Sequence, residues 1–356
     1  MEIAPMLAKA VPDVPEPDSV KGGLRYEPKW DGFRGIVTVD GDDVEIGSRG
    51  AKPLTRYFPE LVEAFRAQFG GRDHPVVLDG EVVLRSGEPG DERLDWEALS
   101  QRIHPAESRI AKLSVETPAQ FVAFDLLAAD GAELTDLPFD ERRARLEALA
   151  ADLADPLFVT RTTLDVDLAR EWLTTFEGAG LDGVVAKPRT RPYEPGKRSM
   201  LKVKHHRTAD VVAIGYRVHK SGTGVGSLLV GLYGDDGELR QVGGVSAFSD
   251  KRRVQLVEEL DPVVLRNADR RPVTGDGERS RFSSGRDTSF VRLEPSVVLE
   301  VRYDQMEGAR FRHTVQFERW RPDRDARSCG FEQLEVPAAY DLRDVLTCVR
   351  LSVLRR

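Results

Sequence analysis

Residues 25–48, RYEPKWDGFRGIVTVDGDDVEIGS, decide the fold of the first part of the chain. The segments RYEPKW and FRGIVTVD have the composition of strands, and the Asp40-Gly41 pair predicts a tight turn into a third strand, VEIGS. Lys29 lies between the first two strands, just before Asp31-Gly32. We therefore expect its amine to be held at a fixed depth and not to move freely in solvent.

Strands and helices alternate on the C-terminal side of this stretch. Apolar residues at helical spacing, bounded by Pro59 and by Gly70-Gly71, predict a helix within residues 57–69. The same signals predict further helices within residues 95–103, 139–153 and 166–180, and strands within residues 75–84, 119–127, 181–187 and 199–204. This order of elements predicts an α+β domain over residues 1–206.

The pattern changes after Arg207, where strands separated by glycine-rich turns predominate. We expect strands within residues 209–219, 227–234, 238–244, 297–303 and 313–320, a helix within 249–260 and a polar loop over 267–292. Five strands with one helix between them are typical of an OB-fold β-barrel, and an SH3-like barrel fits almost as well. We assign this barrel and a C-terminal extension to residues 207–356.

Composition excludes several classes of protein. At 356 residues, 40% hydrophobic and 31% charged, the chain is typical of a globular protein with two or three cores. The N-terminal residues do not resemble a signal peptide, and no apolar run is long enough to span a membrane. Two cysteines, Cys329 and Cys348, cannot form a four-cysteine zinc site or a disulfide framework. We expect a cytoplasmic protein.

The net charge of −8 argues mildly against a partner of high negative charge, but the charge is unevenly distributed. Residues 187–207 contain eight lysines and arginines and one glutamate, Glu194, and a second arginine-rich region covers residues 302–327. Local basic surface on an acidic body suits a protein that binds a polyanion on one face. A solvated charged face is the commoner explanation of any one such run.

Six short motifs follow one another in the first domain, and each has an ordinary structural explanation when taken alone. They are Lys29-Trp30-Asp31-Gly32-Phe33-Arg34, Ser48-Arg49-Gly50, Asp79-Gly80-Glu81, Phe124-Asp125, Asp182-Gly183-Val184-Val185-Ala186-Lys187 and Lys202-Val203-Lys204. Lysine is a nucleophile once burial and neighbouring cations expose its neutral amine. The planar guanidinium of arginine suits phosphate groups, and carboxylates suit hydroxyls or metal ions. Because side chains alternate along a strand, Lys202 and Lys204 lie on the same face.

The order and separation of these motifs resemble the covalent nucleotidyltransferase superfamily of ligases and capping enzymes, and most closely the bacterial ATP-dependent DNA ligases of the ligase C and ligase D kind. The resemblance also covers Pro5-Met6-Leu7-Ala8 and a final motif at Arg319-Trp320-Arg321-Pro322-Asp323-Arg324. It implies an ATP-grasp-like adenylation domain followed by an OB-fold domain.

The resemblance also implies residue roles. Lys29 would form lysyl-AMP, with Asp31, Arg34, Lys202 and Lys204 completing the catalytic set. Glu27 would lie near the adenine amine, Phe124 would stack on adenine, and Arg34 and Glu81 would hold the ribose. Arg49 would contact the nick phosphate, Glu81 and Asp182 would bind the metal, and Lys187, Lys202 and Lys204 would contact the α-phosphate. Arg321 and Asp323 would orient pyrophosphate. Asp182 stands where relatives usually have glutamate, and Arg324 where lysine is common.

These roles imply ATP and Mg²⁺ or Mn²⁺ as cofactors and nicked double-stranded DNA as substrate. The NAD-dependent ligases carry an extra N-terminal domain and a four-cysteine zinc module. Only 28 residues precede Lys29, and two cysteines cannot form that zinc site, so ATP is expected in place of NAD. We expect a monomer that seals nicks in DNA repair, without a membrane, alongside a repair polymerase or primase or end-binding proteins. The alternatives are an RNA ligase, a capping-type nucleotidyltransferase, or a nucleic-acid binding module without chemistry.

Overall fold

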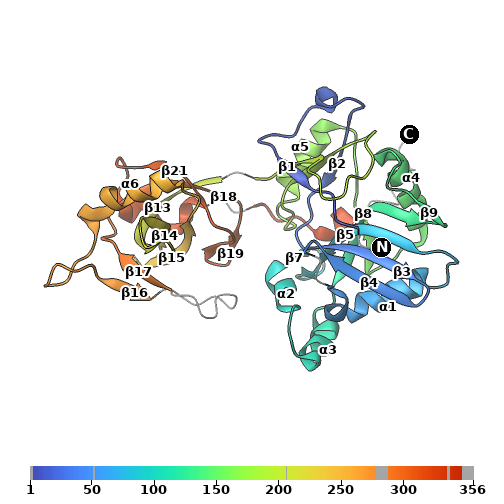
Figure 1. Cartoon of the computed structure of the whole chain (residues 1–356), viewed down its shortest axis with the longest axis horizontal. Helices are drawn as coiled ribbons and strands as arrows, with labels where there is room; N and C mark the ends of the chain where they lie inside the picture. The colour runs from blue at the N-terminus through green and yellow to red at the C-terminus, as the bar shows by residue number, and fades with distance from the viewer. Residues whose placement is uncertain (1–2, 51–52, 206, 277–287, 335–336, 347–356) are drawn as a thin grey trace. The chain divides into compact units, whose positions relative to one another are not determined.

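The computed structural model describes residues 3–50, 53–205, 207–276, 288–334 and 337–346. The chain forms two compact units, one comprising Met1–His205 with Pro337–Arg356 and the other His206–Val336 (Figure 1). Among the described residues, no helix is long and apolar enough to cross a membrane. Cys329 is a buried free thiol, and Cys348 lies outside the described residues.

The larger sheet of the first unit carries residues of four of the six predicted motifs. Its strands pair in the order β10-β8-β5-β3-β4, with β9 at the end of β8. They are β3 (Phe33–Asp40), β4 (Asp43–Ser48), β5 (Val76–Val83), β8 (Gln120–Ala129), β9 (Ala132–Glu133) and β10 (Leu157–Val159). The register places Arg34 opposite Glu81 and Asp79 opposite Asp125. Side chains of three neighbouring strands are thereby fixed relative to one another.

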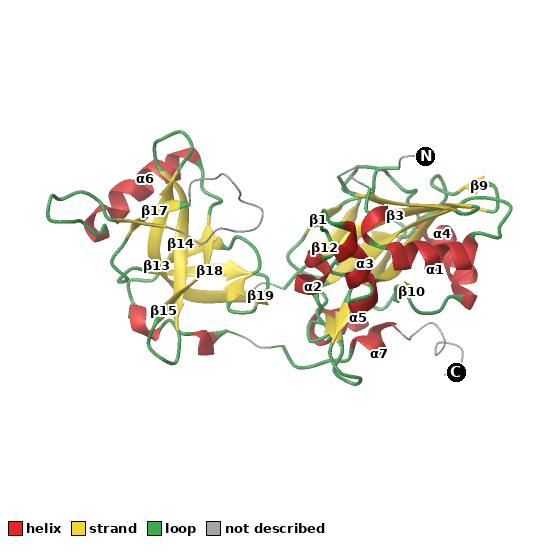
Figure 2. Cartoon of the chain, turned by 90° about the horizontal axis from the view of Figure 1, so that it is seen from below, coloured by secondary structure: helices red, strands yellow, loops and turns green. Residues whose placement is uncertain are grey.

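Helices cover this sheet because their apolar residues recur at helical spacing. In α1 (Pro59–Phe69), Leu61, Phe65 and Phe69 follow one another four residues apart, and all three are buried in the core with the strands. Figure 2 shows α1 and α4 (Phe139–Leu149) beside these strands. The remaining helices of this part are α2 (Trp96–Gln101), α3 (Glu107–Glu116) and α5 (Val166–Thr175), and a short hairpin pairs β6 (Arg85–Ser86) with β7 (Arg93–Leu94).

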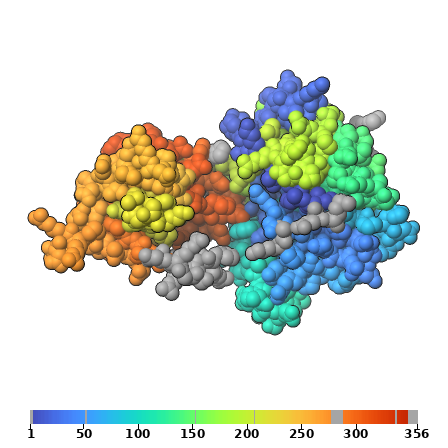
Figure 3. Space-filling model, in the orientation of Figure 1, coloured from blue at the N-terminus to red at the C-terminus, as the bar shows by residue number. Residues whose placement is uncertain are grey.

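In a smaller sheet, the N-terminal segment pairs with a strand that lies nearly two hundred residues later in the sequence. Its order is β1-β12-β11-β2, from β1 (Ala8–Ala10), β2 (Leu24–Pro28), β11 (Val184–Pro188) and β12 (Met200–Val203). β1 runs parallel to β12, with Ala10 opposite Lys202. The space-filling view shows the dark-blue N-terminal residues against yellow-green residues of the same unit (Figure 3).

The second unit is a closed barrel with the strand order of an OB fold. β13 pairs with β14 and β18, β14 with β15, and β18 with β21. A parallel bridge from Val245 to Val315, the residue before β21, closes the ring. The order of the main strands thereby returns to its starting point, as in a barrel. The elements are β13 (Arg207–Val218), β14 (Val225–Tyr233), β15 (Leu239–Val245), α6 (Asp250–Leu260), β18 (Val298–Tyr303) and β21 (Gln316–Trp320), with a β19–β20 hairpin (Met306–Glu307 and Arg310–Phe311).

The segment after the barrel returns to the first unit, which corrects the predicted extent of the second domain. In α7 (Leu342–Leu346), Leu342 and Val345 are almost fully buried in the core that contains Trp172 and Phe176 of the first unit. The Arg343 side chain bonds Glu92 at 2.8 Å. The boundaries 207–356 are therefore wrong at the C-terminal end. The apolar residues of this C-terminal segment indicate that it is buried, but its sequence alone does not indicate which of the two cores buries it.

Two other predictions differ from the structure. The predicted polar loop over residues 267–292 contains β16 (Thr274–Asp276) and β17 (Ser289–Arg292), which pair with each other and continue onto β13; residues 277–287 lie outside the described ranges. The helix α3 was not predicted; most of its residues are polar, and Ile110 is its one buried residue.

Candidate active site

The backbone around Lys29 is fixed by its contacts with the Asp182-Gly183 segment. The Lys29 N–H donates to the Gly183 carbonyl at 2.8 Å, and the Asp182 N–H donates to the Lys29 carbonyl at 2.9 Å. A Cβ at Gly183, where φ is +135°, would lie 2.0 Å from the Val203 carbonyl oxygen, and one at Gly32 would lie 2.1 Å from the Val82 carbonyl oxygen. Both Asp-Gly motifs therefore need glycine for close backbone approach.

Lys29 and Lys204 share one carboxylate oxygen. The Lys29 Nζ lies 2.5 Å from Asp182 Oδ2, and the Lys204 Nζ lies 2.9 Å from the same atom. Burial opposes ionisation of Asp182, but the two lysines outweigh it and hold the pKa of this carboxyl below its usual range. Burial, with the Lys29 and Lys204 charges, lowers the pKa of Lys202 on the neighbouring β12. The structure thus brings Lys29, Asp182, Lys202 and Lys204 together, as predicted.

A pocket of about 420 Å³ opens beside this cluster and takes its walls from both sheets. The four-stranded sheet contributes residues of β1, β2, β11 and β12, and the larger sheet contributes Arg34, Glu81 and Phe124. Of the predicted residues, Glu27, Lys29, Arg34, Arg49, Glu81, Phe124, Lys187 and Lys202 line it. Its size suits a nucleotide, because small-molecule sites commonly measure 300–1,000 Å³.

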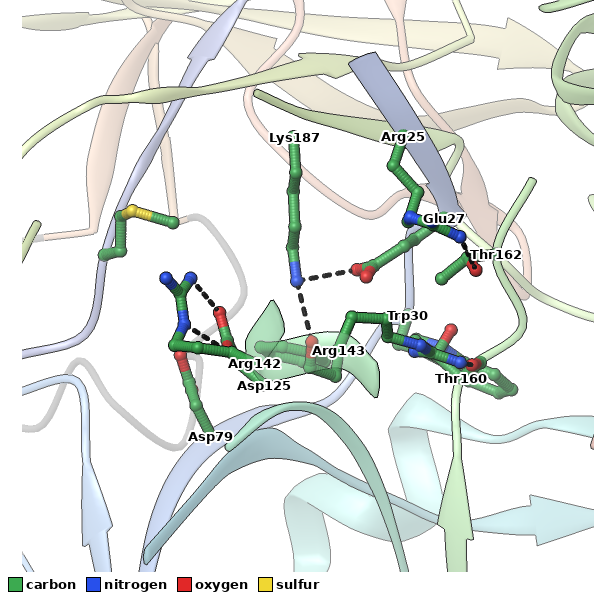
Figure 4. A network of polar contacts seen from close by, with 12 residues as sticks. Arg25, Glu27, Trp30, Asp79, Asp125, Arg142, Arg143, Thr160, Thr162 and Lys187 are labelled. Carbon is green, nitrogen blue, oxygen red and sulfur yellow. Dashed lines mark hydrogen bonds and ion pairs between the residues drawn. The ribbon is translucent and has the colours of Figure 1, made fainter. Parts of the chain in front are cut away.

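One end of the pocket combines an aromatic ring with a buried ion pair. The Lys187 Nζ lies 2.8 Å from Glu27 Oε2 and donates to the Phe124 carbonyl at 3.0 Å (Figure 4). Its ammonium also lies 4.7 Å from the centre of the Phe124 ring. Burial raises the pKa of Glu27, against the opposing effect of Lys187. The Lys187 side chain thus pairs with Glu27 in the pocket wall, and its contact with the α-phosphate stays a prediction.

Glu27 has one carboxylate oxygen left for another molecule. Its Oε1 is buried and has no hydrogen-bond partner within the described part of the chain. A buried acceptor without a donor is costly, and this one belongs to a residue that lines the pocket. The exocyclic amine of adenine would satisfy it, so the geometry suits the predicted position of Glu27 at the base.

Arg34 is held by Asp79, and its contact with the ribose stays a prediction. Its Nε and Nη2 each donate to Asp79 at 2.5 Å, and its guanidinium carbon lies 4.4 Å from the centre of the Phe124 ring. Glu81 lies opposite Arg34 on β5, and burial raises its pKa to about 7, against the charges of Arg34 and Lys29. Arg49 is exposed at the pocket rim. Asp31 is half-buried in the loop after Lys29 and is not a lining residue.

The final motif lies in the second unit and is organised by ion pairs. Arg321 contacts both carboxylate oxygens of Asp210 at 2.9 Å and bonds Asp323 at 2.8 Å. The hydrogen bond from Arg321 lowers the pKa of Asp323 to about 2. The prediction that Arg321 and Asp323 orient pyrophosphate stays a prediction.

Several lining residues were missed by the sequence analysis. Lys9, Trp30, Arg198 and Met200 also line the pocket. Arg198 belongs to the basic run 187–207, so composition had indicated its region without its role. Lys9 follows the Pro5–Ala8 segment directly, and only the pairing of β1 with β12 shows that it reaches the site.

Comparisons with known proteins show what this chain is similar to. Residues 5–204 match the model of the ATP dependent DNA ligase domain, and residues 221–324 match the ATP dependent DNA ligase C terminal region. The chain is 54% identical over 349 residues to DNA ligase C1 of Mycolicibacterium smegmatis, covering 97% of each chain. It is 52% identical to DNA ligase C of Mycobacterium tuberculosis, covering 98% of each.

A solved structure shows the same fold at low identity. It belongs to a study of DNA binding with a minimal scaffold in Lig E DNA ligases, and it aligns with 90% of this chain and all of its own, with a TM-score of 0.55 and 17% identity. That structure shows the fold alone; the matched family models and the two ligase C relatives place the chain in the family of ATP-dependent DNA ligases.

Proposed function

We propose that this chain seals nicks that carry a 3′-hydroxyl and a 5′-phosphate in duplex DNA, through lysyl-AMP on Lys29 and a DNA-adenylate, in DNA repair. The observation that supports this most is the fixed amine of Lys29 at the edge of a nucleotide-sized pocket. Phosphoryl transfer depends on positioning and charge neutralisation. A cluster of lysines, arginines and carboxylates is suited to both.

In the first step the Lys29 nitrogen forms a bond to the α-phosphorus of ATP while the bond to the bridging oxygen breaks and pyrophosphate leaves. Lys29 must first lose a proton and leave its ion pair with Asp182. Lys204 bonds the same Asp182 oxygen and can keep that carboxylate satisfied when Lys29 turns to the phosphate. Lys202, whose pKa is lowered by burial and by these lysines, lies at the pocket wall, where its ammonium would neutralise phosphate charge.

In the second step an oxygen of the DNA 5′-phosphate attacks the phosphorus of AMP, and the Lys29 amine leaves. In the third step the 3′-hydroxyl oxygen attacks the 5′-phosphorus, and AMP leaves. Arg49 is exposed at the pocket rim, where it could contact the nick phosphate as predicted. Arginine's planar fork suits a phosphate group.

The site suits a divalent cation that is coordinated by carboxylates of the protein and by phosphates of the nucleotide. Within the described ranges, no group of three or more His, Cys, Asp and Glu gathers as a metal cage. Mg²⁺ is usually held by one or two carboxylates together with substrate phosphates and water. Asp182 and Glu81 would hold the ion, which would neutralise charge on the phosphates; Mn²⁺ would serve in the same place.

The alternative functions have less support. The matched relatives are named DNA ligases, which does not favour an RNA ligase or a capping enzyme. A binding module without chemistry has no need of a lysine fixed by two backbone hydrogen bonds beside an acidic group. We further propose a monomer in the bacterial cytosol or nucleoid, working beside a repair polymerase or primase or end-binding proteins.

A panel of nicked substrates tests the proposal. We expect sealing of nicked DNA with ATP, little with GTP, and slower sealing of nicked RNA. Lys29→Ala should abolish sealing with ATP but still seal a nick that already carries 5′-AMP, because the third step does not use the amine. Lys197→Ala is the matched control, because the exposed Lys197 side chain has Glu194 as its ion-pair partner among the described residues, and the substitution leaves the Lys197 backbone carbonyl in place. Preference for nicked RNA, or normal sealing by Lys29→Ala, would refute it.

A further inference from the structure

A closed ring of hydrogen bonds lies beneath the nucleotide pocket and includes a tyrosine that belongs to none of the motifs. Arg34 donates to both oxygens of Asp79, and the Tyr193 hydroxyl donates to Asp79 Oδ2 at 2.6 Å. The Met6 N–H donates to the same hydroxyl at 2.9 Å, and Arg34 Nη2 donates back to the Met6 carbonyl at 3.3 Å. Four residues from separate parts of the chain are thereby joined.

The central carboxylate of this ring depends on its partners. Asp79 is 0% exposed, so its charge must be balanced by donors inside the protein. Tyr193 is 4% exposed and packs against Met6 and Met200. Burial and the Asp79 charge raise the pKa of Tyr193, which keeps its hydroxyl protonated and able to donate. Each hydroxyl bond in the ring therefore has a fixed direction, from Met6 through Tyr193 to Asp79.

The ring also fixes one wall of the pocket. Met6 and the residues after it, through Ala10, line the cavity. Outside the ring, this segment is bound through backbone contacts, including Leu7 N–H to Lys197 O at 2.7 Å and Gly196 N–H to Pro5 O at 3.2 Å. Met6 is the residue whose N–H and carbonyl both bond to side chains of the ring. Tyr193 is thus, with Arg34, one of two side chains that link the wall to the buried carboxylate.

Arg34 is oriented by the same contacts. Two of its three nitrogens are bonded within the ring, and its Nη1 has no hydrogen-bond partner in the described ranges. The guanidinium packs on the Phe124 ring, and both residues line the pocket. One donor of a fixed cation is therefore left for a bound molecule.

From this geometry we infer that Tyr193 is a positioning residue for ATP: its hydroxyl couples the Arg34–Asp79 pair to the Met6 wall, so that both are set before the nucleotide binds. A preorganised site loses less free energy to ordering when its ligand binds. Tyr193 contacts no reacting atom, so we expect it to change the affinity for the nucleotide and not the rate of the chemical step. The inference rests on the proposed use of ATP at this site.

Removal of the hydroxyl tests the inference. In Tyr193→Phe, Asp79 loses one donor and the Met6 N–H loses its acceptor, while the ring of the side chain still fills the core. We expect the KM for ATP in single-turnover self-adenylation to rise about tenfold, equivalent to about 1.4 kcal/mol, with the rate at saturating ATP within about twofold of wild type. Tyr57→Phe is the control, since the Tyr57 hydroxyl has no hydrogen bond among the described residues.

A second measurement shows whether Tyr193 acts through Arg34. ATP affinity is measured by calorimetry in a Lys29→Ala background, which prevents turnover, for Tyr193→Phe, Arg34→Gln and the double variant. If the two residues are coupled, Tyr193→Phe weakens binding much less in the Arg34→Gln background. Equal losses in both backgrounds, or an unchanged KM in Tyr193→Phe, would overturn the inference. Failure of wild type to become labelled at all would instead refute the proposed function.

Discussion

Lys187 and Glu27 form a buried ion pair whose disruption should have a large and pH-dependent effect on stability. Both side chains are only 3% exposed, and their charged atoms lie 2.8 Å apart. In Lys187→Met the cation is lost while the aliphatic volume is largely kept, so Glu27 remains as a buried carboxylate without its counter-ion. Removing one partner of such a pair typically destabilises a protein by about 3–5 kcal/mol.

The loss should depend on pH in a defined direction. Burial already raises the pKa of Glu27 in the folded protein, and Lys187 opposes that rise. Without Lys187 the folded pKa moves higher, while the unfolded value stays near 4.3. The folded state then binds more protons than the unfolded state, so the stability of the variant relative to wild type falls as pH rises from about 5 to 8.

Urea denaturation of wild type, Lys187→Met and the double variant Glu27→Gln/Lys187→Met at pH 5, 6, 7 and 8 measures this effect. We expect a loss of about 3–5 kcal/mol for Lys187→Met at pH 8, a smaller loss at pH 5, and recovery of at least half of the loss in the double variant. A loss below about 1 kcal/mol at pH 8, within the range of an exposed pair, would refute the reasoning. A loss that grows as pH falls would refute the assigned sign.

Three further predictions concern other parts of the molecule. Burial raises the pKa of Glu81 to about 7, so its carboxyl stabilises the folded protein below the unfolded pKa and loses that contribution as pH rises to 7. The stability of Glu81→Gln relative to wild type, measured by urea denaturation, should therefore rise between pH 5 and 7 by on the order of 2 kcal/mol. A difference that does not change with pH would contradict this. Leu342→Ala should destabilise the first unit by about 2–5 kcal/mol, because Leu342 is fully buried. Leu168 is partly exposed, so Leu168→Ala should change the denaturation midpoint little. Equal effects of the two substitutions would count against the docking of α7. Affinity for a nicked duplex, measured by fluorescence anisotropy, should fall roughly a thousandfold between 50 and 200 mM salt if about six phosphates are neutralised, and a nearly flat titration would exclude such contacts.

The strands and helices around the motifs were predictable because local signals were strong. The Asp40-Gly41 turn, the β3 strand and the α1 helix follow the sequence pattern closely. The clustering of Lys29, Asp182, Lys202 and Lys204 was also expected, from the resemblance of the ordered motifs. In these places local preference and tertiary structure agree.

The partners of the buried charges could not be predicted. The sequence did not indicate that Arg34 pairs with Asp79 or that Lys187 pairs with Glu27. Arg142 likewise takes Asp125 in a fully buried pair (Figure 4). A motif states which charged residue is present, but its counter-ion depends on strand register across the sheet. The wall formed by Lys9 and the role of Tyr193 depend on contacts between residues nearly two hundred positions apart.

Mapping of the covalent label tests the central claim most directly. The protein is incubated with Mg²⁺ and ATP labelled at the α- or the γ-phosphate, and the modified peptide is sequenced by mass spectrometry. The account predicts label from the α-phosphate alone, as one AMP on Lys29, absent from Lys29→Ala and retained in Lys197→Ala. AMP on another residue, or equal labelling of Lys29→Ala, would contradict it.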